Sequence, residues 1–266
     1  MQRYIELDSF TAVGAGETAN LVLANGPRYD EIYLETNQAA KIEKVVLKLN
    51  AVEVFSLSHA ELEMMRGYDA LPGEAEFITL PMAMMNAVLL DSREYTGLAT
   101  GPGDNVVLEV TFKDDAVNPR LKAFANVSAH AGVRMWTRRF VRNTIPVAAE
   151  GEVDFTSMLK GPDIKVLRMF FKNPNIDKLE IKQDLRTVFE LTDKRNDFLL
   201  KTEGKNVPAG YFVFDTTKRG FPLRDAMETA FQNLNFRLTV GAGGSQNIPV
   251  LIEQLEAVEP RDWRNR

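Results

Sequence analysis

The sequence contains no cysteine. This absence excludes disulfide bridges, zinc sites built on thiolates and cysteine nucleophiles. The chain has two histidines, His59 and His130, which are too few and too far apart for an evident two-histidine metal motif. Metal enzymes built on β-sandwiches need His and carboxylate ligands clustered on strands. We therefore do not expect this chain to be one of them.

The sequence also lacks a long apolar run. No stretch approaches the roughly 18 apolar residues of a membrane-spanning helix. The opening segment MQRYIELDSF carries charges where a signal peptide has an apolar core. We expect neither a membrane-spanning nor a conventionally secreted chain.

A basic surplus is missing as well. The formal net charge is −5, whereas proteins that bind a nucleic-acid duplex usually carry excess positive charge. We therefore expect no direct, sequence-specific binding of nucleic acid by this chain.

Motifs for catalysis or cofactor binding are absent. The glycine-rich stretches at 14–16 and 241–244 lack both the Lys-Ser/Thr ending of a phosphate loop and a strand-to-helix setting, so they are expected to be turns. Asp114 and Asp115 follow a predicted strand and could contribute to a structural calcium site, although paired acids at a turn are usually solvated. We predict no catalytic residue and no cofactor, and leave structural calcium open.

What the sequence does contain is an internal repeat. IEKVVLKLNAVEVFSL at 42–57 matches IDKLEIKQDLRTVFEL at 176–191 with an offset of 134. Three further pairs follow in the same order, and their offsets drift between 127 and 135: Gly26-Pro27 with Gly161-Pro162, 105–112 with 233–240, and 121–129 with 248–256. Four matches in one order indicate a duplication that gave two sibling domains.

The repeated segments alternate apolar and polar residues with a period of two and are rich in β-branched and aromatic side chains. This pattern is typical of half-buried strands. Each half has room for about eight short strands, a number that favours a jelly roll. We predict an all-β protein with two tandem eight-stranded jelly-roll β-sandwiches and a few short helices, with domains at 1–147 and 148–266.

The repeat also predicts core positions. Apolar residues kept in both copies should be buried, which applies to the pairs Val54/Val188, Phe55/Phe189 and Leu57/Leu191.

The segment RMWTRRFVRN at 134–143 interleaves arginines with aromatic residues. Such a pattern fits an anionic partner, or a connector between domains whose arginines pair with nearby acids. The candidate interaction patch consists of Arg134, Trp136, Arg138, Arg139, Phe140 and Arg142, together with Trp263 in the polar tail.

The chain resembles the double-jelly-roll major capsid proteins of tailless icosahedral viruses with an internal membrane, and most of all the small capsid proteins of corticovirus-type bacteriophages. The likeness spans nearly the whole sequence. It is carried by IELDSFTAVGAGETANLVLANGPRYDEIYLE, MWTRRFVRN, NIDKLEIKQD, DFLLKTEGKNVPAGYFVFD and the closing strand into LEAVE.

The resemblance implies a structural protein of the virion, made in the host cytoplasm, and not an enzyme. It implies a homotrimer with a pseudo-hexagonal outline that tiles an icosahedral shell over an internal membrane. The partners it implies are neighbouring trimers, penton or vertex proteins, minor membrane-associated capsid proteins and the membrane itself. Bound calcium also occurs in such shells.

Two other functions stay open at this point. One is a double-sandwich hydrolase that processes glycans, because paired carboxylates for that chemistry have no fixed spacing in sequence. The other is a viral spike module that binds carbohydrate or a host surface.

Overall fold

The computed structural model describes residues 2–129, 134–156, 158, 160–244 and 247–258. The backbone divides into two compact units, which we call unit 1 (residues 1–67, 71–140 and 257–266) and unit 2 (68–70 and 141–256). Strand β10 (Trp136–Ile145) therefore runs from unit 1 into unit 2. Because β10 runs across the division between the two units, this division does not locate a domain boundary. The predicted domain boundary after residue 147 therefore stays a prediction.

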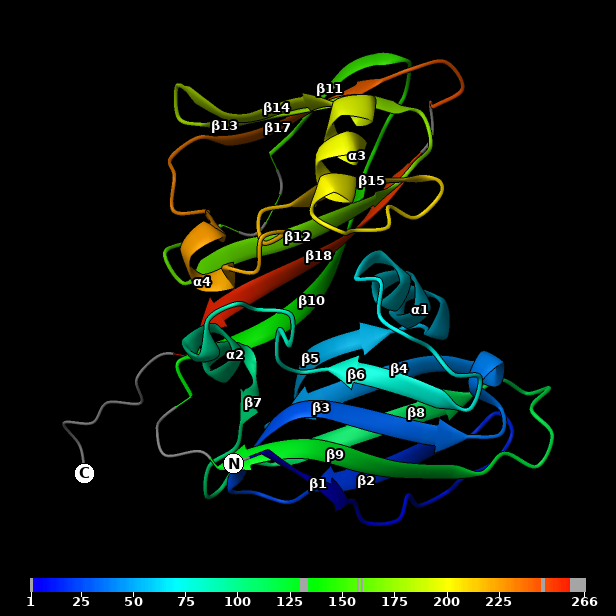
Figure 1. Cartoon of the computed structure of the whole chain (residues 1–266). Coiled ribbons are helices and arrows are strands. Elements are labelled where there is room, and N and C mark those ends of the chain that lie inside the picture. Colours follow the sequence, from blue (N-terminus) through cyan, green and yellow to red (C-terminus); the bar gives the residue numbers. More distant parts are fainter. Residues whose placement is uncertain (1, 130–133, 157, 159, 245–246, 259–266) are drawn as a thin grey trace. The chain divides into compact units, whose positions relative to one another are not determined.

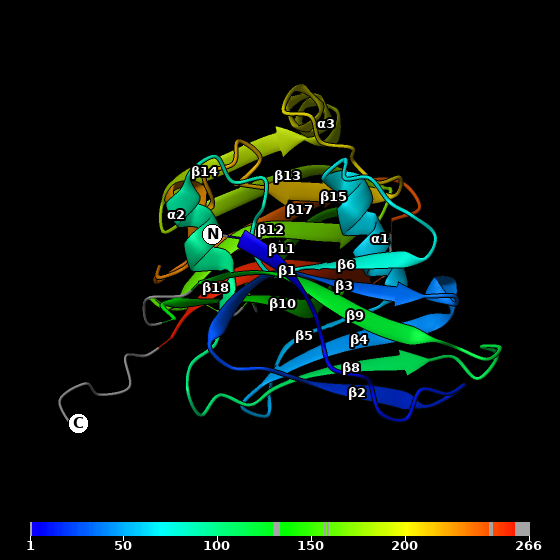
Figure 2. The same ribbon diagram turned by 60° about the horizontal axis from the view of Figure 1, so that its bottom comes forward.

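Unit 1 contains two antiparallel sheets (Figure 2). The first has the order β1-β9-β3-β6, with β7 paired to β3; its strands are β1 (Gln2–Glu6), β9 (Leu121–Ala129), β3 (Pro27–Thr36), β6 (Phe77–Pro81) and β7 (Leu98–Ala99). The second has the order β2-β8-β4-β5; its strands are β2 (Thr18–Leu23), β8 (Val106–Phe112), β4 (Ile42–Leu49) and β5 (Val52–Leu57).

Unit 2 repeats this plan (Figure 1). Its first sheet has the order β10-β18-β12-β15, with β16 paired to β12; after β10 its strands are β18 (Ile248–Ala257), β12 (Ile164–Lys172), β15 (Tyr211–Asp215) and β16 (Met227–Glu228). Its second has the order β11-β17-β13-β14; its strands are β11 (Gly151–Phe155), β17 (Leu234–Val240), β13 (Ile176–Gln183) and β14 (Arg186–Thr192). Strand for strand, the two units have the same topology.

The helices fall at matching places. Each unit has one helix between its fifth and sixth strands, namely α1 (His59–Tyr68) and α3 (Asp193–Thr202). A shorter one precedes each two-residue strand, namely α2 (Leu90–Thr96) and α4 (Pro222–Asp225), and a 3-10 turn, η1 (Ala39–Lys41), precedes β4. None of the helices in the described part of the chain is long and apolar enough to cross a membrane.

The repeat extends to irregularities of the backbone. The register of β4 against β5 shifts between Leu47 and Lys48, and that of β13 against β14 shifts between Ile181 and Lys182, which lie 134 positions later. A second pair of shifts occurs against β8 and β17, after Ile42 and after Ile176. Bulges at equivalent positions indicate that both hairpins descend from one ancestor. The fold confirms the predicted double jelly roll.

The alignment of β3 with β12 differs from the predicted offset of 135. Each strand carries one bulged residue against its long partner, Asp30 in β3 and Leu167 in β12, which gives an offset of 137. The difference arises because β3 begins at Pro27, directly after Gly26, whereas β12 begins at Ile164, two residues beyond Pro162.

The core prediction from the repeat holds in one copy and fails in the other. In β5, Val54, Phe55 and Leu57 are buried. In β14, the corresponding Val188 is exposed, and Phe189 and Leu191 are only partly buried. The sequence pattern is the same, so the difference depends on what covers each strand.

Candidate functional site

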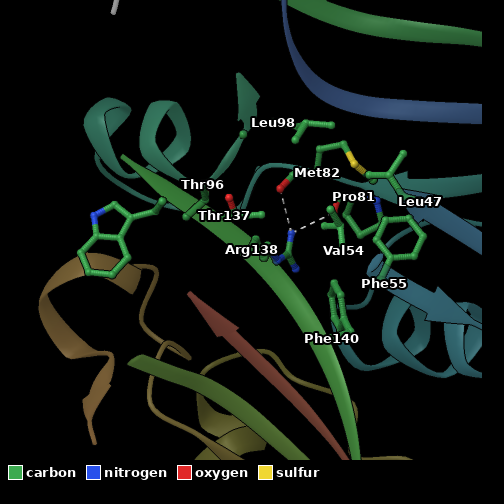
Figure 3. A pocket seen from close by; sticks show the side chains of 12 residues that line it. Leu47, Val54, Phe55, Pro81, Met82, Thr96, Leu98, Thr137, Arg138 and Phe140 are labelled. Atoms are coloured by element: carbon green, nitrogen blue, oxygen red, sulfur yellow. Dashed lines mark hydrogen bonds between the residues drawn. The ribbon is translucent and has the colours of Figure 1, made fainter. Parts of the chain in front are cut away.

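The arginine-rich segment forms the beginning of β10, and its best-placed cation is Arg138. This side chain is buried, and its Nη1 donates hydrogen bonds to the carbonyl oxygens of Pro81 (3.0 Å) and Met82 (3.5 Å) (Figure 3). It also donates to the carbonyl oxygen of Ala83 (3.3 Å). Its guanidinium also lies 5.2 Å from the centre of the Phe140 ring. Arg138 therefore fixes the chain that follows β6, since a buried guanidinium needs such acceptors.

Arg134 is also engaged inside unit 1. Its Nη1 lies 3.0 Å from the Asp104 carboxylate and donates to the Ala99 carbonyl oxygen at 2.8 Å. Burial acts to raise the pKa of Asp104, but hydrogen bonds from Arg134, the Gly101 amide and Asn50 lower it overall. The pair is mostly shielded from water, which makes it stronger than an exposed ion pair.

Phe140 and Arg139 cover the edge strand β5. The Phe140 ring meets Phe55 edge-on with centroids 6.2 Å apart, and Arg139 Nη2 donates to the Glu53 carbonyl oxygen at 2.6 Å. The pocket beside them, lined among others by Leu47, Met82 and Trp136, has a volume of about 10 Å³, which is about the space of one water molecule. It is too small to hold a sugar.

The remaining patch residues are separate from this cluster. Arg142 lies on the part of β10 that belongs to unit 2 and is exposed. Trp263 lies outside the described residues, as does His130. The structure thus brings Arg134, Trp136, Arg138, Arg139 and Phe140 together on unit 1, and binding of an anionic partner by this segment stays a prediction.

No grouping of acidic and histidine side chains suggests a metal centre. Among the residues that the structure describes, no three His, Asp or Glu side chains converge in a way that could hold an ion. Asp115 instead pairs with Lys41 at 2.5 Å, and the hydrogen bond from Lys41 lowers the pKa of Asp115.

A buried ionic cluster in unit 2 was not anticipated from the sequence. Arg168 Nε lies 2.5 Å from Glu253, its strand neighbour, and its Nη1 lies 2.8 Å from Asp69, to which Lys205 also binds at 2.7 Å. Tyr68 donates to Asp215 at 2.7 Å. The signal in the sequence was a charge inside each of two apolar strands, VLRMFF and VLIEQLE.

The charges of this cluster stabilise one another. Burial acts to raise the pKa of Asp69, but Arg168 and Lys205 outweigh it and lower the pKa to about 2. Burial, followed by the nearby Asp215 charge, raises the pKa of Tyr68. Burial also raises the pKa of Asp215 against the opposing effect of Arg168. Ion pairs of this kind fix the fold, because removing one partner leaves an uncompensated buried charge.

Unit 1 has different polar residues at the positions equivalent to Arg168 and Glu253. Glu31 and Asn126 are strand neighbours in β3 and β9, where β12 and β18 have Arg168 and Glu253. Asn126 Nδ2 donates to Glu31 at 3.3 Å. The two units therefore share a backbone and differ in the polar groups on the outer face of the sheet.

Comparison with known proteins agrees with this two-part architecture. The family model of the viral coat protein P2 N-terminal domain matches residues 4–128, and that of the viral coat protein P2 C-terminal domain matches residues 137–258. No curated protein sequence matches the chain.

Solved structures share the fold over almost their whole length. The major capsid protein P2 of bacteriophage PM2 is similar with a TM-score of 0.88 and 15% identity, covering 98% of this chain and 99% of that one. The STIV MCP has a TM-score of 0.68 at 8% identity (96% and 97% covered), and PBCV-1 VP54 has 0.63 at 9% (96% and 92%). With both halves matched by the paired family models, the chain belongs to the viral coat protein P2 family.

Proposed function

We propose that three copies of this chain form a trimer with a pseudo-hexagonal outline, and that these trimers tile an icosahedral shell over an internal membrane. The observation that carries the proposal is the duplication itself. Both units have the same strand order, the same helix positions and the same two bulges in the second sheet. Two similar units in each of three chains give six similar corners, so a threefold oligomer can occupy a hexagonal lattice.

The proposed partners are neighbouring trimers, vertex proteins and minor membrane-associated capsid proteins. The net charge of −5 supports a shell that the bilayer separates from the genome, because a protein that packages nucleic acid directly needs a basic surface.

Light scattering on the purified chain tests the oligomer. We expect a mass three times that of the 29.9 kDa chain at micromolar concentration, and negative-stain images of native particles should show six-cornered units in their shells. A monomer at every concentration, without such units in the particles, would contradict the proposal.

A further inference from the structure

Edge strand β5 is covered within unit 1. Phe140 and Arg139 of β10 lie over it, through the edge-on contact of Phe140 with Phe55 and the bond of Arg139 to the Glu53 carbonyl. Phe140 is 8% exposed and Phe55 is 3% exposed as a result. This cover supplies the burial that the apolar pattern of β5 requires.

Among the residues that the structure describes, none covers the equivalent edge strand of unit 2 in the way that Phe140 and Arg139 cover β5. Val188 in β14, the counterpart of Val54, is 42% exposed, and Phe189, the counterpart of Phe55, is partly exposed. Phe198 and Leu199 on α3, which packs against β14, are 66% and 37% exposed. We call Val188, Phe198 and Leu199 the β14 surface.

The element that corresponds to β10 is β1. Gln2 lies opposite Ser128 in β9, whose counterpart in β18 is Leu255. The amide of Val258 donates to the Met135 carbonyl oxygen at 2.9 Å, which places these two residues opposite each other. Three residues further along the antiparallel strands β10 and β18, Arg138 lies opposite Leu255. Arg3 and Tyr4 thus correspond to Arg139 and Phe140, and the sequence repeats accordingly, with RYI at 3–5 and RFV at 139–141.

Tyr4 differs from Phe140 in being exposed. Its exposed fraction is 69%, and its ring begins an aromatic row over the outer face of the first sheet of unit 1. Tyr4 lies 6.4 Å from Tyr33, which stacks on Phe124 at 4.7 Å, and Phe77 follows at 6.3 Å between ring centroids. We call Tyr4, Tyr33, Phe124 and Phe77 the aromatic row.

In unit 2, the outer face of the first sheet is covered by the residues at the end of α1. Phe170, 137 positions after Tyr33, is fully buried because the Tyr68 ring meets it edge-on at 5.4 Å, and Asp69 binds the neighbouring Arg168. Tyr68 is the last residue of α1, whose counterpart is α3. At the end of α3, the equivalent Thr202 is exposed instead. In the aromatic row of unit 1, Tyr4 and Phe77 are exposed, and Tyr33 and Phe124 are only partly buried.

In the described part of the chain, each unit therefore has one surface that lacks the cover found on its counterpart, and one element that does not cover the surface its counterpart covers. The end of a helix equivalent to α1, such as α3, would cover the aromatic row as the end of α1 covers Phe170. A strand equivalent to β10, such as β1 with Tyr4, would cover the β14 surface as Phe140 covers β5. We propose that the β14 surface of one copy packs against the aromatic row of a second copy, with Tyr4 on β14 and α3 over Tyr33. This inference rests on the proposed trimer and names its interface. The contact is head-to-tail, so it generates a ring when the rotation closes.

The absence of cysteine makes a cross-linking test direct. Tyr4→Cys with Val188→Cys in one chain, treated with a short bismaleimide reagent, should yield covalent products of two and three chain masses. Each single-cysteine variant, and Tyr4→Cys combined with Val117→Cys, should remain at the mass of one chain. Val117 is 66% exposed and belongs to neither surface.

Charge substitutions provide a second measurement. Tyr4→Asp and Phe198→Asp should each raise the concentration at which the oligomer dissociates by at least about tenfold, because each buries an unpaired carboxylate in the contact. Val117→Asp should leave it unchanged. Circular dichroism would show that the variants are folded.

The outcomes separate the inference from the proposed function. A trimer by light scattering with no cross-linking above the Val117 control, or with equal dissociation of all three variants, would overturn this interface and leave the trimer standing. A chain that is monomeric throughout would overturn both.

Discussion

Thr100 and Thr229 occupy the same place in the two units and bind the backbone in the same way. The hydroxyl of Thr100 accepts from the Gly26 amide (3.0 Å) and donates to the Pro27 carbonyl oxygen (2.7 Å). The hydroxyl of Thr229 accepts from the Gly161 amide (3.2 Å) and donates to the Ile164 carbonyl oxygen (2.7 Å). Both residues are buried, and each closes the turn that leads into the long strand β3 or β12.

Replacing either threonine with valine should destabilise the protein. The substitution keeps the volume but removes two partly buried hydrogen bonds, each of which contributes about 0.5–1.5 kcal/mol to the free energy of unfolding. The double variant should show the sum, because the two sites share no partner. Urea unfolding measures this, with the exposed Thr11→Val as the control. If replacing Thr100 or Thr229 lowered the free energy of unfolding no more than replacing Thr11 does, the equivalent structural roles of Thr100 and Thr229 would be contradicted.

Arg168→Met should destabilise unit 2 by about 3–5 kcal/mol, because Glu253 and Asp69 would keep buried charges without their main counterion. Thermal unfolding of the double variant with Glu253→Met should recover part of the loss. Lys165→Met is the matched control on the same strand, since Lys165 and Glu228 form a more exposed pair worth at most about 1 kcal/mol. Equal effects of Arg168→Met and Lys165→Met would argue against a structural role for the cluster.

Asp69 should make stability depend on pH in the acid range. Its pKa in the folded chain is about 2, below the ordinary 3.8, so its contribution is present above about pH 4 and is lost as the pH falls toward 2. The shift corresponds to about 2 kcal/mol. The raised pKa of Asp215 acts in the opposite direction, so the measurement is the difference between the native chain and Asp69→Asn, followed by urea unfolding from pH 6 to 2. A constant difference across this range would refute the prediction.

Ala51→Gly should stabilise the hairpin of β4 and β5 by about 0.5–1 kcal/mol. Asn50 and Ala51 both have positive φ, 53° and 65°, which fits a two-residue hairpin turn but strains alanine. In the equivalent turn of unit 2 Asp184 has positive φ and Leu185 does not, so Leu185→Gly should bring no gain. Thermal unfolding of both variants compares them, and an equal gain at both sites would show that φ is not the cause.

The sequence alone determined the architecture and, through family resemblance, the role. Its period-two pattern and its repeat predicted two jelly rolls, because alternation places one face of every strand in a core. Membership in a viral coat protein family confirms a structural capsid protein of the virion, and it favours neither the hydrolase nor the spike module. The turns at Gly14–Gly16 and Gly241–Gly244 were likewise predicted, because turns depend on local sequence.

Only the tertiary structure decided which of the repeated apolar residues are buried. Phe55 and Phe189 stand in the same local pattern, but Phe55 lies under Phe140, whereas no described residue covers Phe189 in that way. It also decided that Arg134 and Arg138 bind inside unit 1 and that Arg168 is enclosed by carboxylates. Burial and pairing depend on residues that are distant in sequence, and a local pattern does not specify which distant segment will lie above it.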